Sequence, residues 1–299
     1  MKSVALIIGL ILLVGITVVG CSTPHPTVDI NSSPIIRIIT VNETVAVNTT
    51  ILLSSDADFQ LLRIKPRALG SVGTEVLIID PYETNLSARE IQSFEGELYA
   101  IVPMEKILRS QPFFNETWRV GKPNFITHRS GSTYEVKYWD RAYQELVYEE
   151  VQRLAALGYD GVYLQGVSEY RNYDDFRRGE MKEFIRGIYN NGQVMGTEFG
   201  IIVEDAPELI LDGSYSSYIM GYAQGEVWYQ GSRPAPYEER DRVLSLLQLA
   251  AREGKKVFIV EYPQPQNAIC DFYTKCSNEG FYCTITAKDW KRVEPVQCA

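Results

Sequence analysis

The sequence predicts an α/β fold, a single (β/α)8 barrel of the TIM type. The chain has 299 residues, of which 45% are hydrophobic, and single α/β barrels typically use about 250 residues. Short β-rich runs alternate with amphipathic helical stretches along the body, an order typical of parallel β/α units. Eight such runs are found, and eight is the strand number of this barrel.

The chain begins with a segment typical of an export signal. Lys2 is followed by an uninterrupted apolar run over residues 4–20. The run ends in Val18-Val19-Gly20-Cys21, which resembles the lipobox of prokaryotic lipoproteins, where the cysteine is lipidated and becomes the first residue. The alternative is an uncleaved anchor helix, for which the run is near the lower length limit. Both alternatives place the body outside the cytoplasm, so we expect a membrane-anchored protein at the cell surface.

These features divide the chain into four segments. We expect a signal peptide at residues 1–20 and a lipid-anchored flexible tether at residues 21–45, because the tether is polar and proline-rich. The barrel is expected at residues 46–265. A cysteine-rich C-terminal segment, residues 266–299, is expected to pack on the barrel.

Charge and histidine content bear on partners and cofactors. The net charge is −9, and phosphate binding needs a basic surface, which the sequence does not concentrate anywhere. We therefore expect no nucleic-acid partner and no affinity for anionic lipid. The chain contains two histidines, so we expect no metal site, and nothing indicates another cofactor.

Cysteines gather near the C-terminus. Cys270, Cys276, Cys283 and Cys298 follow one another within the final segment. In an oxidising exterior this pattern predicts two disulfides, with three pairings open. A zinc site is the alternative, although the spacings match no familiar zinc finger.

The eight predicted strands are short runs rich in β-branched and aromatic residues. An open doubly wound sheet is the alternative arrangement, but no glycine-rich phosphate-binding turn follows the first run, which favours the closed barrel. The predicted strands are residues 50–53, 75–79, 98–102, 124–127, 161–164, 195–202, 218–222 and 256–260.

Three helices are predicted from apolar residues that recur on one helical face. The strongest covers residues 138–157 and is followed by Gly158, which can take the left-handed conformation that ends a helix. The others cover residues 180–190 and residues 240–252.

Acidic residues follow six of the predicted strands, at the end where such barrels carry their reacting groups. Singly, each acid is more often a solvated loop residue or the partner of an arginine. As a set interleaved with Tyr and Trp they predict a carbohydrate site, because aromatic faces stack on sugar rings and two carboxylates suffice for glycoside hydrolysis. The acids are Asp80, Glu105, Glu169, Glu198, Glu226 and Glu261.

Roles can be assigned within this set. We expect Glu226 to be the general acid and Asp80 or Glu105 to be the base or nucleophile. The residues expected to bind substrate are Tyr82, Tyr163, Gln165, Tyr170, Glu198, Tyr222, Trp228, Glu261 and Tyr262.

Residues 156–170 read Ala-Leu-Gly-Tyr-Asp-Gly-Val-Tyr-Leu-Gln-Gly-Val-Ser-Glu-Tyr. This run resembles the signature of endo-α-1,4-polygalactosaminidase-like barrels, glycoside hydrolase family 114 and its uncharacterised prokaryotic relatives. Members typically read Gly-Phe-Asp-Gly-Val-x-Leu-Asp-Asn-x-Asp-x-Tyr. Other landmarks occur in the same order, including the strand ending at Asp80 and Gly254-Lys-Lys-Val-Phe-Ile-Val-Glu-Tyr262. The resemblance implies a glycosidase-like barrel acting on polysaccharides that contain amino sugars.

The chain departs from this signature at its acids. The Asp-Asn-x-Asp motif falls on Gln165-Gly166-Val167-Ser168, and an amide cannot transfer the proton. Glu169, one position further, could substitute in part. Two functions therefore remain open, a surface glycosidase and a catalytically inactive carbohydrate-binding barrel, with a purely structural envelope protein as a third.

Overall fold

The computed structural model describes residues 59–63, 65–66, 69, 72–193, 198–231, 233–262 and 264–291. All of them belong to one compact unit, residues 43–299. The expected signal peptide, Cys21, the whole tether, the predicted strand 50–53 and Cys298 lie outside the described residues. Among the helices that the structure describes, none is both long and apolar enough to cross a bilayer.

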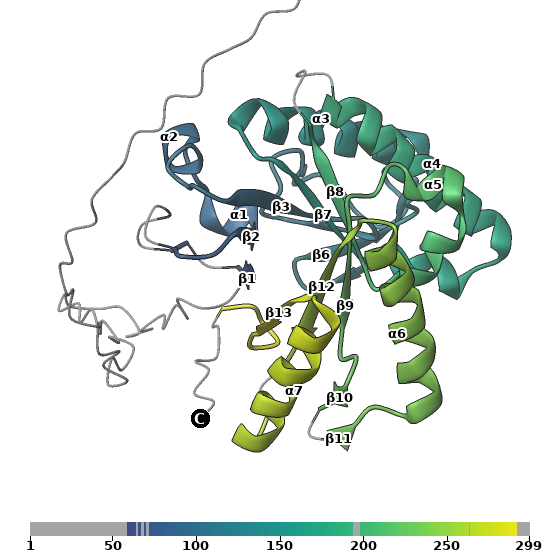
Figure 1. Ribbon diagram of the computed structural model, residues 1–299. Coiled ribbons are helices and arrows are strands. Elements are labelled where there is room, and N and C mark those ends of the chain that lie inside the picture. Colours follow the sequence, from purple (N-terminus) through teal and green to yellow (C-terminus); the bar gives the residue numbers. More distant parts are fainter. Residues whose placement is uncertain are drawn as a thin grey trace, which may run out of the picture. The chain divides into compact units, whose positions relative to one another are not determined.

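Eight parallel strands form one sheet that curves into a nearly closed barrel (Figure 1). The first and last strands lie side by side, and the Arg63 N–H donates to the Trp290 carbonyl oxygen at 2.7 Å where they meet. The predicted barrel is therefore confirmed. In spatial order the strands are β1 (Phe59–Leu62), β2 (Val76–Ile79), β3 (Glu97–Pro103), β7 (Gly161–Gln165), β8 (Gly200–Glu204), β9 (Gly221–Gly225), β12 (Lys256–Glu261) and β13 (Tyr282–Ile285).

Helices cover the outside of the sheet (Figure 1). The three predicted helices are present. The first ends at Gly158, whose φ of 102° is left-handed as expected. The helices are α1 (Pro81–Thr84), α2 (Ala88–Ile91), α3 (Arg141–Leu157), α4 (Asp175–Gly192), α5 (Gly213–Ser216), α6 (Tyr237–Arg252) and α7 (Gln266–Glu279), with the 3₁₀ helices η2 (Val167–Asn172) and η4 (Pro207–Leu211).

Alternation along each strand separates two apolar cores. Ile202 of β8 and Val260 of β12 point into the barrel, whereas Val203 and Ile259 face the helices. Because side chains alternate along a strand, this parity decides which residue at each strand end reaches the barrel mouth. We use barrel mouth for the opening at the C-terminal ends of the strands.

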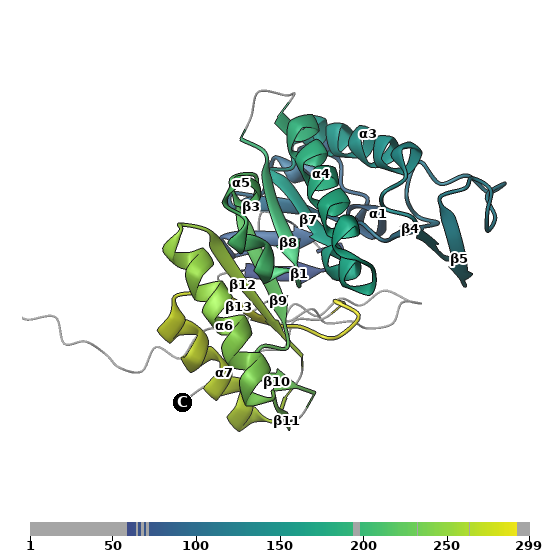
Figure 2. The same ribbon diagram turned by 90° about the vertical axis from the view of Figure 1, so that its right-hand side faces the viewer.

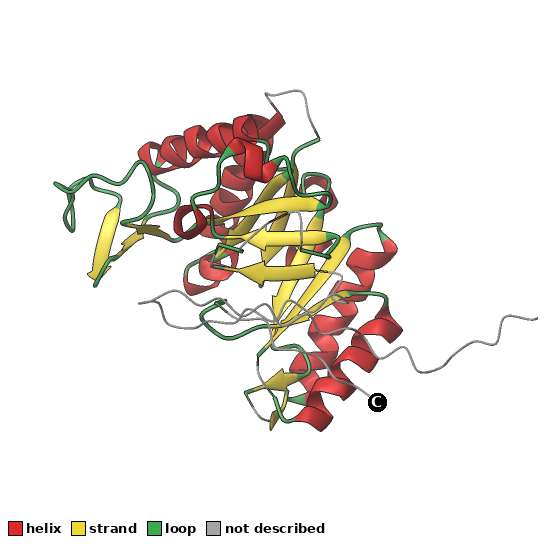
Figure 3. Cartoon of the chain, turned by 90° about the vertical axis from the view of Figure 1, so that its left-hand side faces the viewer, coloured by secondary structure: helices red, strands yellow, loops and turns green. Residues whose placement is uncertain are grey.

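One predicted barrel strand is wrong. Residues 124–127 overlap β5 (Ile126–Ser130), which pairs in a small antiparallel sheet with β6 (Thr133–Val136), itself paired with β4 (Lys106–Leu108). This sheet is inserted between β3 and α3 and projects from the barrel (Figures 2 and 3). A short β-rich run looks alike in both settings, because periodicity does not identify the partner strand.

The eighth strand comes instead from the C-terminal segment. β13 pairs in parallel with β12, and α7 connects the two, so residues 266–285 supply the last β/α unit. Cys276 of α7 and Cys283 of β13 form a disulfide. Cys270 is also disulfide-bonded. Disulfide bonding in this segment therefore agrees with the prediction, and the segment is more than a layer packed on the barrel.

Candidate active site

Glu204 ends β8 at the barrel mouth. The Tyr163 hydroxyl donates to its Oε1 at 2.8 Å, and the Gly166 N–H donates to its Oε2 at 3.2 Å. Burial, and next the charge of Asp205, raise the pKa of Glu204 to about 7, while the two hydrogen bonds act in the opposite direction. A carboxyl group that is partly protonated at neutral pH can donate a proton.

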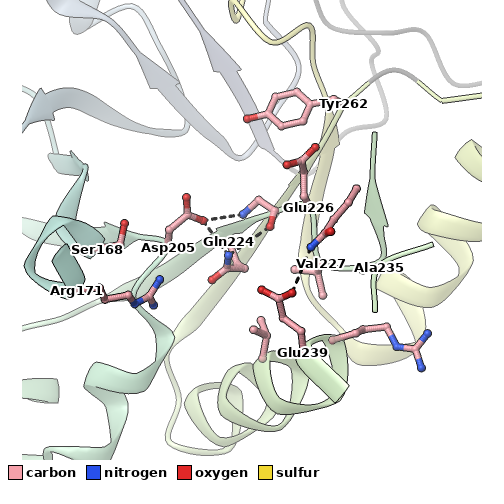
Figure 4. Close-up of a pocket in the computed structure, with 13 residues that line it drawn as sticks. Ser168, Arg171, Asp205, Gln224, Glu226, Val227, Ala235, Glu239 and Tyr262 are labelled. Atoms are coloured by element: carbon pink, nitrogen blue, oxygen red, sulfur yellow. Dashed lines mark hydrogen bonds between the residues drawn. The ribbon is translucent and has the colours of Figure 1, made fainter. Parts of the chain in front are cut away.

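Asp205 follows directly and turns the chain. Its φ of 53° is left-handed, an uncommon conformation for a residue with a side chain. Its Oδ1 accepts from the Gly225 N–H at 3.0 Å and from Gln224 Nε2 at 2.9 Å. Burial raises the pKa of Asp205. These bonds fix the end of β8 to the end of β9, as Figure 4 shows.

Glu226 occupies the matching position after β9 and is also left-handed, with φ 52°. Its Oε1 accepts from the Gly231 N–H at 3.2 Å and lies 3.8 Å from Lys288 Nζ. The side chain is 35% exposed.

A pocket of about 280 Å³ opens beside these residues (Figure 4). This is near the lower end of ligand pockets, roughly 300–1,000 Å³. Its wall combines the ends of β8, β9 and β12 with η2 and α6, and includes Asp205, Glu226, Tyr262, Ser168, Arg171 and Glu239. Two arginines line the pocket. Arg171 is paired with Glu208 through two bonds of 2.7 and 2.6 Å, and Arg240 is paired with Asp241 at 3.2 Å, so the unpaired charge of the pocket is that of its carboxylates.

The opposite side of the mouth is filled. Arg63 donates to Gln165 Oε1 at 3.0 Å, lies 3.7 Å from Asp80 Oδ2, and stacks over Trp290 at 4.6 Å from the ring centroid. Asp80 is 2% exposed and caps α1 by accepting from the Tyr82 and Glu83 N–H groups at 3.0 and 3.2 Å. Asp80 is thus committed to structural bonds.

Glu105 stands between the two sides. It pairs with Lys106 at 2.6 Å, and its charge contributes to the raised pKa of Glu204. A Cβ on Gly166 would lie 1.8 Å from Glu105 Oε2, so only glycine fits at position 166. Among the described residues, no group of three or more His, Cys, Asp or Glu could hold a metal ion.

Four predicted substrate-binding residues face the helices instead of the mouth. The Tyr170 hydroxyl donates to Glu208 at 2.5 Å, and Trp228 packs on Phe272 with centroids 5.7 Å apart. Burial, and next the charge of Glu253 at the end of α6, raise the pKa of the Tyr222 hydroxyl. Burial, and next the charge of Glu150 on α3, raise the pKa of the Tyr82 hydroxyl, while the charge of Arg153 on the same helix lowers it. Each belongs to the outer core or its edge, because strand parity or the loop turns it outward.

Three predicted acids also lie elsewhere. Glu198 is exposed and precedes β8, at the end of the barrel away from the mouth. Glu169 accepts from Asn172 at 3.0 Å on η2. Glu261 is 0% exposed and accepts from the Trp228 and Tyr229 N–H groups at 2.9 and 3.3 Å. Glu261 therefore lies on the helix-facing side of β12 and fixes the loop after β9 through these two hydrogen bonds.

The structure brings Glu105, Tyr163, Gln165, Glu226 and Tyr262 to the mouth as expected, and adds two acids. Glu204 and Asp205 were missed because the predicted strand 195–202 ends before them, whereas β8 ends at Glu204. A later strand end would have placed both among the acids that follow strands.

Comparison with known proteins supports the fold. No family model matches the chain. An uncharacterised protein of Deinococcus radiodurans is 27% identical over 199 residues, 63% of this chain and 65% of that protein. MJ1477 of Methanocaldococcus jannaschii, also uncharacterised, is 24% identical over 59% of this chain and 57% of its own length. The chain thus spans less than two thirds of both relatives.

Two solved structures share the barrel. The glycoside hydrolase domain of PelA from Pseudomonas aeruginosa superposes with a TM-score of 0.64 at 10% identity, over 80% of this chain and 99% of that domain. Ega3 of Aspergillus fumigatus, in complex with galactosamine, gives 0.60 at 15% identity, over 81% and 95%. The fold is therefore a TIM barrel that both of these structures share.

Proposed function

We propose that the protein hydrolyses glycosidic bonds in a polysaccharide that contains amino sugars. The observation that carries this proposal is Glu204, a carboxyl group at the barrel mouth whose pKa burial raises to about 7. It ends β8, and the neighbouring strand β9 is followed by the half-buried Glu226. One carboxyl group that donates a proton and a second that acts as nucleophile or base are what glycoside hydrolysis requires. The carboxylate-lined pocket and the galactosamine in the Ega3 structure support an amino-sugar substrate.

In this mechanism Glu204 is the general acid, a role we first expected for Glu226. It transfers its proton to the glycosidic oxygen as the bond to the anomeric carbon breaks. Tyr163 and the Gly166 N–H then stabilise the carboxylate that remains, because both donate to it. Glu226 attacks the anomeric carbon or takes a proton from the attacking water, and Tyr262 offers an aromatic face in the pocket wall.

The test is an assay of new reducing ends on amino-sugar polymers and on neutral glucans. We expect Glu204→Gln and Glu226→Gln to lower the rate by about 10²- to 10⁴-fold, since each removes a proton-transfer or nucleophilic group. Glu238→Gln is the matched control, because Glu238 is an exposed acid of α6 that does not line the pocket. A full rate in Glu204→Gln would refute the assignment of the acid.

A second function, sugar binding without catalysis, is favoured by Gln165. This amide stands where the resembling family carries an acid, and its Oε1 is occupied by Arg63 at 3.0 Å. Under this alternative the wild-type protein binds the polymers without cleaving any of them. Tyr262→Ala would then weaken binding, while Glu204→Gln would leave it unchanged.

We also propose that the protein works outside the cytoplasm, held to a membrane by a lipid on Cys21. The support is the sequence at residues 2–21. Cys21→Ser should abolish partition of the mature protein into detergent. Unchanged partition and processing would argue against the lipid.

A further inference from the structure

The insertion after β3 forms a separate surface, which we call the basic arm and define as residues 106–137. It contains β4, β5 and β6 and leaves the barrel after the C-terminal end of β3. It therefore starts on the face that carries the barrel mouth. Figures 2 and 3 show its sheet standing away from the barrel.

The basic arm carries charge opposite to that of the whole protein. Residues 117–137 contain four cations, Arg119, Lys122, Arg129 and Lys137, and one acid, Glu135, in a chain of net charge −9. The first three are exposed. Among the described residues none of them pairs with a carboxylate, and Arg129 lies over the Tyr134 ring, 5.2 Å from its centroid. This corrects our expectation that basic residues are nowhere concentrated.

Exposed aromatic rings lie at the base of the basic arm. Tyr173 is 47% and Phe176 70% exposed, unusual for rings of this size. Tyr173 packs edge-on against Trp139 with centroids 5.0 Å apart. Burial, and next the charges of Glu169 and of Glu135 on β6, raise the pKa of the Tyr173 hydroxyl. We call the two exposed rings, Tyr173 and Phe176, the aromatic corner. Both residues follow η2, and Gly166, the residue before η2, donates its N–H to Glu204.

We propose that the basic arm and the aromatic corner dock an acidic stretch of the polysaccharide whose cleavage is proposed above. Guanidinium and ammonium groups would pair with carboxylate, sulfate or phosphate groups of the polymer, and its sugar rings would stack on the aromatic corner. The inference rests on the proposed function and narrows its substrate to a polymer carrying both amino sugars and acidic groups.

A polysaccharide fits this surface better than an anionic membrane does. Tyr173 and Phe176 follow η2, whose Ser168 and Arg171 line the pocket, and a polymer spans several subsites. Exposed rings beside cations suit a sugar chain. β1 begins at the other end of the barrel, because all eight strands run parallel, so the described chain enters from the face away from the arm.

The test compares two triple variants of the full-length chain that remove the same charge. The arm variant is Arg119→Gln, Lys122→Gln and Arg129→Gln. The control is Arg89→Gln, Arg242→Gln and Arg252→Gln, three exposed cations that make no ion pair with a described residue. Binding is measured to immobilised hyaluronan, polygalacturonate and dextran, and to phosphatidylglycerol vesicles, at low and high salt.

We expect the wild type and the control to bind an acidic glycan, more weakly at high salt, and not dextran. The arm variant should bind about tenfold more weakly, as expected for three exposed charge contacts. Tyr173→Ala with Phe176→Ala should weaken the same binding. Equal binding by arm variant and control would overturn the inference, as would a wild type that binds vesicles but neither acidic glycan.

Failure of the docking surface can be told apart from failure of the proposed function. Glu204→Gln should bind acidic glycan like the wild type, because binding does not need the acid. A wild type that binds through the arm and cleaves nothing would refute hydrolysis and leave the docking surface standing. Cleavage that is equal in arm variant and control on the acidic polymer would refute docking alone.

Discussion

Glu204 and Asp205 are neighbours in the chain with different tasks, set by the groups around them. Glu204 accepts from a tyrosine hydroxyl and one N–H, so its carboxylate is stabilised only partly and its proton is retained to about pH 7. The Oδ1 of Asp205 receives two donors from the adjacent strand end. We therefore assign proton transfer to Glu204 and a positioning role to Asp205.

Replacing Tyr163 should move the pH dependence of hydrolysis. The Tyr163 hydroxyl stabilises the ionised form of Glu204 and lowers the pKa of that group, so Tyr163→Phe should raise it further. The acid must be protonated to react, hence the rate of the wild type should fall as the pH rises above about 7. In Tyr163→Phe this fall should begin at higher pH, as seen in rate profiles of kcat/KM.

Tyr222→Phe is the control for this shift. Tyr222 is as buried as Tyr163, each being 1% exposed, but it faces the outer core. Removing the Tyr222 hydroxyl should leave the pH at which the rate falls unchanged. An unmoved profile in Tyr163→Phe would contradict the role of Glu204 as the acid that titrates.

At the scale of single residues, sequence reasoning was limited by parity and by long-range partners. Glu226 and Tyr262 could be predicted because they follow strands. The outward direction of Glu261 depends on which residue of β12 faces the barrel, and a run buried on both faces does not reveal that. The bond between Arg63 and Gln165 joins positions far apart in the chain, so no local pattern predicts it.

The loop after β9 depends on a buried carboxyl group. Burial raises the pKa of Glu261 to about 7, while its bonds to Trp228 and Tyr229 oppose the rise. Between about pH 4.5, the ordinary pKa of a glutamate, and about pH 7, Glu261 is therefore protonated in the folded protein and ionised in the unfolded chain. The free energy of unfolding should fall as the pH rises through that window.

Glu261→Gln should flatten this dependence. One proton corresponds to about 1.4 kcal/mol per pH unit, so the wild type should lose up to that much more stability per unit than the variant between pH 5 and 7. Urea unfolding at several pH values measures the difference. The control is Glu238→Gln, which replaces an exposed acid on α6 and should retain the wild-type slope. A wild-type slope in Glu261→Gln as well would contradict the prediction that Glu261 holds a proton in the folded protein.

The junction of β7 and η2 should tolerate no side chain at Gly166. Its φ is 78°, and a Cβ would lie 1.8 Å from Glu105 Oε2. Gly166→Ala should therefore destabilise the protein by more than about 1 kcal/mol and lower the rate, since the same residue donates to Glu204.

Gly179→Ala provides the opposite expectation. Gly179 lies inside α4, and a Cβ there meets nothing within 4 Å. The substitution should stabilise by about 0.5–1 kcal/mol, because alanine favours the helix. Chemical denaturation of both variants checks the pair, and equal effects would show that Gly166 is not constrained.

At the scale of elements, the sequence predicted what is local. The helix over residues 138–157 has its own apolar face and stop, so it appears as α3 with its end at Leu157. The run 124–127 has strand composition but pairs within the arm, and composition does not encode the partner. β13 was missed because its four residues follow the cysteine-rich α7, and we interpreted this segment as a disulfide-bonded layer on the barrel.

The whole barrel depends on its last β/α unit. β13 covers the edge of β12 through a parallel ladder, and Phe272, Cys276 and Ile285 are buried with exposures of 0%, 1% and 0%. Trp290, beyond β13, lies in the barrel interior and stacks with Arg63 beside β1. Residues near the two ends of the described chain therefore close the barrel together.

A chain that stops after residue 265 should consequently fail to fold. The sequence had predicted that the barrel ends at this residue. The truncated chain would expose the β12 edge, an open template for aggregation, and would leave the interior without Trp290.

The full chain with Cys276→Ser and Cys283→Ser is the informative comparison. It keeps α7 and β13 and loses only the link between positions 7 residues apart, which should cost about 2–3 kcal/mol. Circular dichroism and urea unfolding should show a cooperative transition for the cysteine variant at lower urea than for wild type, and none for the truncated chain. A truncated chain with a wild-type transition would mean that the barrel is complete without β13.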